Sequence, residues 1–442
     1  MPFLPGWDIV GKEKAKEVGD LQEQLAVLRR RIRRIDRKYA NQTTDQPPNR
    51  PTEQPNNRPT GRPLHYFADE WMSGEAVETP HGSHFETEKL FGRHRRHGSM
   101  DISNLAELPE DLLISLSDGD AAPSSPMRWA FLDTETTGLA GGSGTYAFLV
   151  GVGRICPEGF RVRQFFMRDF GEEPSLLWAL EQHLEQFDVL VTYNGKSYDQ
   201  PLLETRFRMG RRRPPFARLA HLDLLYGARR LWKLRLESCR LVDLENQILG
   251  VLREGDVPGE MIPYIYFEYL RTKQAWRVVP IFHHNVMDIL TLACLTGIVP
   301  LAFRSPEEAP LEHGADWVGL ARWLLRTERH EEALGILRRA VERGLSDDLL
   351  FRTLWEIGLI EKKLGRESAA LAAFTELAGS RNAYRVPALE ELAKYYEHRE
   401  RNYAMALEFT RAALAQDDSS GLRHRSERLR RRLEAPRRRP IG

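Results

Sequence analysis

Residues 129–138, WAFLDTETTG, decide the fold, because they place two acids inside an apolar run. The run ends at Gly138 and predicts a strand, and residues 146–150, YAFLV, predict a second strand after a small-residue turn. Side chains two apart on a strand point to the same face, so Asp133 and Glu135 are expected side by side. Adjacent buried carboxylates repel each other, and a hard divalent cation is the usual compensation. The alternative is an edge strand with two solvated surface acids.

The stretches that follow predict a mixed α/β domain over residues 126–304. We expect a third strand at 161–167, a helix at 174–187 with a proline near its start, and a short buried strand at 189–192. Three strands before the first helix, followed by a strand that returns to the sheet, are typical of a ribonuclease-H-type sheet and of other α/β folds as well.

A second acidic stretch follows the fourth predicted strand. Residues 193–203 read YNGKSYDQPLL, in which Asn-Gly turns the chain off the strand and Tyr198 is expected to be an apolar anchor. Asp199 then stands at the start of a helix. Taken alone, it could equally be a helix N-cap.

The third stretch is residues 283–290, HHNVMDIL, which leads into a helix. On a regular helix His284 and Asp288 share a face, whereas His283 lies roughly 140° from Asp288. His284 is therefore the better partner for Asp288 if the helix includes both histidines. If the helix begins only at Asn285, the side chain of His283 can still reach Asp288.

Together the three stretches resemble the three motifs of the DEDD 3′–5′ exonuclease superfamily. These motifs are Asp-x-Glu on the first strand, Asn-Gly with an aromatic-Asp pair, and a His or Tyr before a final Asp. The intervening residues 221–225 (HLDLL), 236–241 (LESCRL) and 255–259 (GDVPG) are similar to the YprB-like ribonuclease-H-like family of bacteria, and the resemblance covers roughly residues 128–304.

The resemblance implies a 3′–5′ exonuclease that hydrolyses phosphodiester bonds of DNA or RNA by a two-metal mechanism. It implies that two Mg²⁺ or Mn²⁺ ions are held by Asp133, Glu135, Asp199 and Asp288. His284 would deprotonate or orient the attacking water. The superfamily's histidine branch spaces His five before the last Asp and its tyrosine branch spaces Tyr four before it. Both spacings carry a histidine here, so the choice between His284 and His283 stays open.

Further residues could hold the nucleic acid. Asn194 and Lys196 stand where a backbone phosphate or a terminal nucleotide would bind, although Lys196 could also be an ordinary surface lysine. Residues 206–240 carry eleven Lys and Arg against two acids, and we expect them to follow the backbone of a single-stranded end. Alternatively, these long side chains cover helix surfaces. Asp223 is a secondary candidate that supports the four acids.

The C-terminal third predicts only helices. Equivalent Ala-Leu pairs occur at residues 333, 370 and 406, so their spacing is 37 and then 36 residues. This is close to the ~34-residue tetratricopeptide period. We therefore expect an all-α, tetratricopeptide-like solenoid over residues 311–417, with a basic tail at 418–442. Its ligand stays open between a protein partner, a second nucleic-acid contact and self-association.

The N-terminal region predicts three further segments. A heptad pattern at 18–39 within residues 1–40 predicts a helix that either forms a homodimer or docks on its own core. Residues 41–63 predict a flexible linker. Residues 64–125 are expected to pack on the nuclease domain, with strand pieces near Phe85 and a helix starting at 108–113. The histidines of this segment are expected to be solvated loop residues rather than zinc ligands: His81, His84, His94 and His97.

Length, charge and composition limit the class of protein to which this chain can belong. The chain has 442 residues, a formal net charge of +1 and three cysteines, which fits two or three domains in a reducing cytoplasm. It has no run like the ~18 uncharged apolar residues of a membrane span, and its start has no signal-peptide core. The competing reading from another class is a catalytically silent nucleic-acid-binding or scaffold protein that uses the helical repeats for assembly.

Overall fold

The computed structural model describes residues 73–116, 122–138 and 144–434. The predicted N-terminal helix with its pattern at 18–39 and the predicted linker at 41–63 lie outside the described residues. So does the end of the basic tail, residues 435–442.

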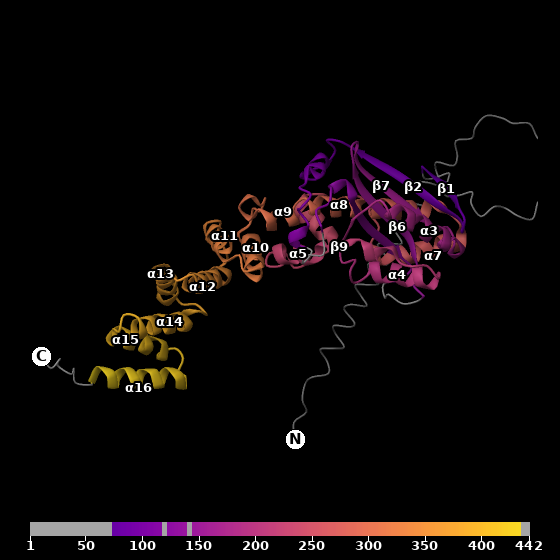
Figure 1. Ribbon diagram of the computed structural model, residues 1–442. Coiled ribbons are helices and arrows are strands. Elements are labelled where there is room, and N and C mark those ends of the chain that lie inside the picture. The colour runs from indigo at the N-terminus through magenta and orange to yellow at the C-terminus, as the bar shows by residue number, and fades with distance from the viewer. Residues whose placement is uncertain (1–72, 117–121, 139–143, 435–442) are drawn as a thin grey trace, which may run out of the picture. The chain divides into compact units, whose positions relative to one another are not determined.

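A seven-stranded mixed sheet organises the described part of the chain, in the order β1-β2-β7-β6-β5-β8-β9 (Figure 1). The central strand β5 pairs antiparallel with β6 and parallel with β8. This arrangement confirms the predicted mixed sheet. The structure adds that β5, β6 and β7 are antiparallel neighbours and that β8 returns to the sheet beside β5. The strands are β1 (Gly74–Thr79), β2 (Gly82–Gly92), β5 (Trp129–Thr136), β6 (Ala147–Cys156), β7 (Gly159–Phe166), β8 (Val189–Thr192) and β9 (Ala220–Asp223), with a separate pair β3 (Arg96–His97) and β4 (Met100–Asp101).

The hairpin β1–β2 extends the sheet beyond β7. Phe85 of β2 pairs with Phe166 of β7, and both rings are fully buried. The helix predicted to start at 108–113 is wrong, because these residues form turns between short 3₁₀ segments at Ile102–Glu107 and Ile114–Leu116. Tertiary packing overrides the local helix signals. The turns instead bury three leucines in the core: Leu108, Leu112 and Leu113.

Helices cover both faces of the sheet. The longest of them in this domain, α8, packs on β5 and β6, where two glycines of β6 let it approach. A Cβ at Gly151 would lie 2.1 Å from Asn285 Oδ1, and a Cβ at Gly153 would lie 2.5 Å from Ile289 Cγ2. The helices are α3 (Glu173–Leu184), α4 (Asp199–Met209), α5 (Leu224–Trp232), α6 (Leu241–Leu244), α7 (Ile262–Thr272), α8 (Val279–Thr296) and α9 (Val299–Arg304).

Residues Ala275–Arg304 are the one described stretch whose length and composition would allow a membrane span. In its most apolar window, 83% of the residues are buried inside the protein. The apolar character of α8 is therefore explained by its position in the core, where it packs against the sheet.

A run of helices follows the sheet domain, as predicted (Figure 1). The Ala-Leu pairs fall on α11, α13 and α15, each the second helix of an antiparallel pair, and their alanines are buried where the paired helices touch. The arrangement is that of a helical solenoid. Its helices are α10 (Gly314–Arg326), α11 (His330–Glu342), α12 (Asp347–Lys363), α13 (Glu367–Gly379), α14 (Arg385–His398), α15 (Tyr403–Leu414) and α16 (Ser420–Glu434).

Candidate active site

The sheet presents Asp133 and Glu135 to α8. Asp133 pairs with Gly151 of β6, the glycine whose missing side chain leaves room for Asn285. Glu135 is two residues further along β5 and is only 8% exposed. The two acids therefore occupy the face of the central strand that the sequence predicted, at the edge of the core.

Asn285 of α8 ties this helix to the acid strand. Its Nδ2 donates to Asp133 Oδ2 at 2.8 Å and to the Asp133 carbonyl at 3.2 Å. Gln164 Nε2 of β7 donates to Asn285 Oδ1 at 2.8 Å, which fixes the orientation of the amide. Asn285 is fully buried. This contact fixes both the position and the rotamer of Asp133.

Asp199 reaches the site from the start of α4. Thr134 Oγ1, between the two acids of β5, donates to Asp199 Oδ1 at 2.5 Å. Asp199 thus lies at the end of the same strand, although it comes from a helix that follows β8. Tyr198, expected as an apolar anchor, is instead 58% exposed beside it.

Asp288 and His284 lie on the same face of α8, as predicted for a regular helix. His284 Nε2 is 3.5 Å from Asp288 Oδ2, and His284 Nδ1 is 2.9 Å from the carboxylate of Asp256. Because α8 starts at Val279, His283 is also helical, and its side chain is exposed on another face. The geometry brings His284, and not His283, to the acids.

Arg253 is a site residue that sequence reasoning missed. Its guanidinium lies 2.5 Å from Asp288 Oδ1, 3.1 Å from Asp256 Oδ2 and 2.5 Å from Glu245 Oε2, and its side chain is only 4% exposed. A single arginine in an irregular segment gives no periodic or motif signal. Its neighbour Asp256 belongs to the 255–259 stretch that carried part of the family resemblance.

Burial and neighbouring acids raise the pKa of Asp133 and Glu135. Burial, followed by the charges of Asp288 and Asp199, raises the pKa of Asp133 well above its usual range. Burial and the charge of Asp133 do the same for Glu135, and burial raises the pKa of Asp199 to about 6. Buried carboxylates with raised pKa values are stabilised in their ionised form by a nearby positive charge, so such a group favours the binding of a cation.

The donor chemistry fits a hard cation such as Mg²⁺ or Mn²⁺, because the acids supply only oxygen ligands. In the described residues, however, no three His, Cys, Asp or Glu side chains converge closely enough to form a ready-made metal site. Arg253 meanwhile supplies positive charge to Asp288. Metal binding would thus require the carboxylates to move closer together.

The electrostatics of His284 follow from the same cluster. Burial lowers its pKa, but the hydrogen bond to Asp256 and the charge of Asp288 outweigh burial, so the pKa lies above the usual value. The pKa of Asp256 is lowered, because its contacts with His284 and Arg253 outweigh its burial. Asp256 is therefore the group that orients the imidazole.

Asp223 supports the loop that leads to Asp199. Its carboxylate accepts hydrogen bonds from the backbone N–H of Asn194 at 2.7 Å and of Lys196 at 3.1 Å, and it also caps α5 through Leu225 N. Asn194 has φ of 67°, in the left-handed region. The side chain of Lys196 is exposed and that of Asn194 is half-buried, so both border solvent near Asp199.

Part of the basic stretch 206–240 is neutralised within the protein, which corrects the expectation that all of it faces nucleic acid. Arg206 is 3% exposed and pairs with Glu173 at 2.5 Å. Arg212 pairs with Glu181, and Arg235 pairs with Asp316 of α10. The exposed members of this stretch include Arg211, Arg213, Arg229 and Lys233.

Comparison with known proteins matches this region to a family. A model of the RNase H superfamily matches residues 130–299, which contain β5 and α8. A Bacillus subtilis protein described as "Uncharacterized protein YprB" is 34% identical over 315 residues, covering 69% of this chain and 75% of that protein.

Proposed function

Because the chain belongs to the YprB family and carries an RNase H superfamily domain, we propose that it is a metal-dependent nuclease, acting as a 3′–5′ exonuclease on DNA or RNA. One observation carries the proposal: acids from β5, α4 and α8 lie near one another, and burial together with the charges of these neighbours raises the pKa of Asp133 and Glu135. A divalent cation relieves repulsion of this kind. The exonuclease assignment comes from the motif resemblance.

The proposed metal ligands are carboxylates alone. RNase H-like nucleases usually use divalent metal ions, and here two Mg²⁺ or Mn²⁺ ions would be held by Asp133, Glu135, Asp199 and Asp288. When bound, such a pair activates a water and stabilises the leaving 3′ oxygen of the phosphodiester. Asn285 would keep Asp133 in its rotamer, because its amide already bonds the Oδ2 atom.

His284 is the proposed general base. Asp256 bonds its Nδ1 at 2.9 Å, which leaves Nε2 directed toward Asp288 and available to take a proton from the attacking water. His283 is the weaker candidate, since its exposed side chain lies on another face of α8.

The substrate would enter as a single-stranded end along the loop before α4. Tyr198 is 58% exposed and precedes Asp199, so its ring is available to stack on a terminal base. Asn194 and Lys196 would hold the adjacent phosphate, and the exposed arginines Arg211 and Arg213 would extend the contact. Binding through these groups would weaken as salt rises.

One contact favours the competing function, a catalytically silent nucleic-acid-binding or scaffold protein. The Arg253 guanidinium lies 2.5 Å from Asp288 and supplies positive charge to this acid without a metal. In that case the helical pairs after α9 would provide the assembly surface. The two functions differ in whether the acids support cleavage.

Cleavage of 5′-labelled single strands tests the proposal. With Mg²⁺ or Mn²⁺, we expect stepwise shortening of linear DNA or RNA and no cutting of a circular strand. Asp133→Asn and Asp288→Asn should abolish the shortening. Asp348→Asn, which removes an exposed acid at the start of α12, should not. Absence of cleavage with every metal and substrate would contradict the nuclease, and cutting of the circle would contradict exonuclease action.

A further inference from the structure

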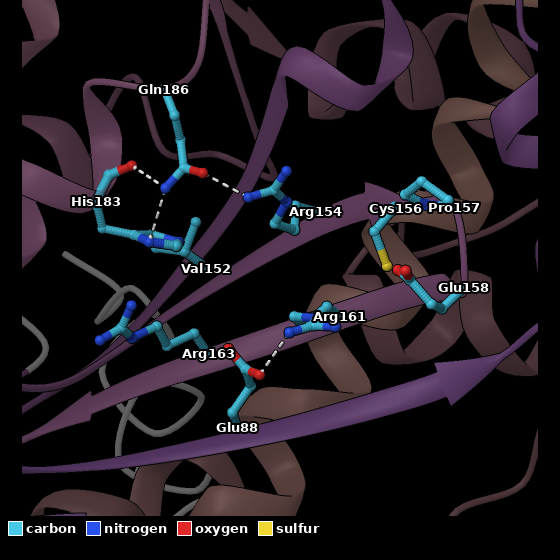
Figure 2. A pocket seen from close by; sticks show the side chains of 10 residues that line it. All are labelled: Glu88, Val152, Arg154, Cys156, Pro157, Glu158, Arg161, Arg163, His183 and Gln186. Atoms are coloured by element: carbon cyan, nitrogen blue, oxygen red, sulfur yellow. Dashed lines mark hydrogen bonds and ion pairs between the residues drawn. The ribbon is translucent and has the colours of Figure 1, made fainter.

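A cavity of about 320 Å³ lies apart from the acid cluster, bordered by strands β2, β6 and β7 and by α3 (Figure 2). Its lining includes Glu88, Arg154, Arg161, Arg163, His183 and Gln186. Cavities of this size hold small molecules.

The cavity is on the opposite face of the sheet from the acids. Gly151 and Gly153 of β6 face α8, since a Cβ on either would meet a side chain of that helix. Residues alternate along a strand, so Val152 and Arg154 face the other way. His183 of α3 packs against Phe165 on that second face, with ring centroids 5.5 Å apart. A ligand here would not touch the acid cluster.

Three arginines line this cavity, and carboxylates are paired with only some of them. Arg154 of β6 is directly opposite Arg161 of β7, and like charges at such positions repel each other. Arg161 pairs with Glu88 and Arg163 pairs with Glu86. Arg154 has no carboxylate partner among the described residues and instead donates to the neutral amide of Gln186. The lining carries three arginines and two glutamates, Glu88 and the exposed Glu158, and Glu86 beside it balances the charges in number. Within the described part of the chain, Arg154 is therefore the arginine of this lining whose charge is left without a direct carboxylate partner.

Two buried donors on residues that line the cavity lack acceptors in the described part of the chain. Gln186 Oε1 accepts from Arg154, so the amide nitrogen of Gln186 faces His183 Nδ1, at 3.1 Å, and donates to it (Figure 2). The neutral ring must then carry its proton on Nε2. Burial lowers the pKa of His183 to about 4, so the ring is neutral near pH 7. Within the described residues, neither His183 Nε2 nor Arg154 Nε has a hydrogen-bond partner.

An oxyanion is the acceptor that both groups lack, and it reaches them when the His183 ring and the Arg154 guanidinium turn toward the cavity. His183 is only 9% exposed, so its Nε2–H has little access to bulk water. Arginine pairs match phosphate and carboxylate geometry, and a phosphate monoester has three terminal oxygens for donors that arrive from different strands and from α3. The cavity is larger than one phosphate group, which leaves room for an attached organic portion.

We propose that this cavity binds the phosphate group of a small ligand, between Arg154, Arg161 and His183. The ligand is either free phosphate or a nucleoside monophosphate, and the two share the chemistry that these donors recognise. The site is independent of the nuclease assignment, because it uses none of the acids of β5 and requires no metal.

Calorimetric titration of the full chain in EDTA tests the site. The probes are inorganic phosphate, a nucleoside 5′-monophosphate and a single-stranded oligonucleotide. We expect saturable binding of at least one of the first two probes, with one ligand per chain. Arg154→Gln should weaken that binding by about tenfold or more. Arg271→Gln, which removes an exposed arginine paired with Glu268 on α7, should leave it unchanged.

A second variant covers the case in which Arg154→Gln does not fold. Arg161 is 36% exposed, so Arg161→Gln should fold, and it should weaken binding in the same direction. If the nucleoside monophosphate binds more tightly than phosphate, its organic portion also contacts the cavity and the ligand is the nucleotide. If the two bind equally, the ligand is free phosphate. No binding of either probe up to about 10 mM would overturn the proposal. The proposal would also be overturned if only the oligonucleotide bound and Arg154→Gln abolished that binding.

Discussion

At the scale of single residues, Asn285 links three elements of the site. It bonds Asp133 on β5 and is itself oriented by Gln164 on β7. The amide is fully buried, so each of these hydrogen bonds is shielded from water. The position of Asp133 therefore depends on a side chain with no charge of its own.

Asn285→Ala should destabilise the metal-free protein by about 1–3 kcal/mol, because it leaves a buried donor and a buried carboxylate oxygen without their partner. Urea unfolding measures the change. Gln182→Ala on the exposed face of α3 is the control and should stay within about 0.5 kcal/mol. An Asn285→Ala protein as stable as the unaltered chain would show that the amide does not constrain Asp133.

Arg253 is the second decisive residue, since it faces Glu245, Asp256 and Asp288 together. Arg253→Met should cost about 3–5 kcal/mol without metal, because it leaves several buried acids uncompensated. Adding Mn²⁺ should recover part of that loss and raise the melting temperature of the variant more than that of the unaltered protein.

Thermal unfolding with and without Mn²⁺ checks this prediction. Arg271→Met, at an exposed position, provides the matched control. Equal Mn²⁺ effects on Arg253→Met and the unaltered protein would indicate that the arginine and the metal do not compensate the same acids.

The sequence predicts four acids for the candidate site but not the residues that surround them. Acids at fixed spacing on a strand or a helix leave a local pattern, as do His284 and Asp288 on α8. Arg253 leaves no such pattern, because it lies in an irregular segment and its contact with Asp288 spans 35 residues. The expectation that His84 and His97 lie in solvated loops is wrong, because both side chains are buried. His84 bonds Glu86 and Ser175, which requires the hairpin to join the sheet.

At the scale of elements, the junction between α5 and α10 depends on one glycine. A Cβ at Gly319 of α10 would lie 2.4 Å from the carbonyl oxygen of Arg230 and 2.5 Å from that of Leu231. Backbone atoms cannot move aside as a side chain can. The close approach of these two helices therefore excludes every larger residue at this position.

Gly319→Ala should destabilise the protein by about 1–3 kcal/mol, because the added methyl group overpacks the α5–α10 contact. Gly335→Ala on α11 is the matched control, since a Cβ there meets nothing within 4 Å. It should stabilise the chain by up to about 1 kcal/mol through helix propensity. Chemical denaturation of the two variants checks the pair, and effects of the same sign would contradict the packing described for α10.

Most elements of the sheet domain could be predicted, because their apolar periodicity is local. The sequence indicates the hairpin β1–β2 only as strand pieces, because its partner strand β7 is distant in the chain: Phe85 pairs with Phe166 and Gly92 with Gly159. The helix start predicted at 108–113 is wrong because the local signals, a proline followed by acidic residues, are those of a helix start. Its leucines are buried by the surrounding core instead.

At the scale of the whole molecule, one hydrophobic cluster joins the sheet domain to the first solenoid helices. It includes Trp129 of β5, Leu292 of α8, Trp317 of α10 and Leu337 of α11. The composition change near residue 310 indicates a change of architecture. It does not reveal that the core continues across that point, because such packing appears only in three dimensions.

Acid should destabilise the folded protein through buried histidines. The folded-state pKa of His97, His183 and His221 is about 4, mainly because of burial, against an ordinary value of 6.5. A lowered histidine pKa favours the neutral form, so its contribution is complete above about pH 6.5 and is lost as pH falls toward 4. Each of these histidines should lower the free energy of unfolding by about 2 kcal/mol between pH 7 and pH 5.

The raised pKa values of Asp133, Glu135 and Asp199 act in the opposite direction as pH falls. The histidine contribution is therefore measured as a difference between variants. His221→Gln should lose about 2 kcal/mol less than the unaltered protein between pH 7 and pH 5. Identical pH dependence of the two unfolding free energies would show that His221 is not held neutral.

Binding of Mn²⁺, followed by the electron paramagnetic resonance signal of the free ion, tests the proposed metal site most directly. The proposal that Asp133, Glu135, Asp199 and Asp288 hold the metal predicts about two bound ions per chain. It also predicts that Asp133→Asn and Asp288→Asn lose this binding, whereas Asp348→Asn retains it. Failure of the unaltered chain to take up Mn²⁺, or equal uptake by all three variants, would contradict a metal-dependent nuclease at this site.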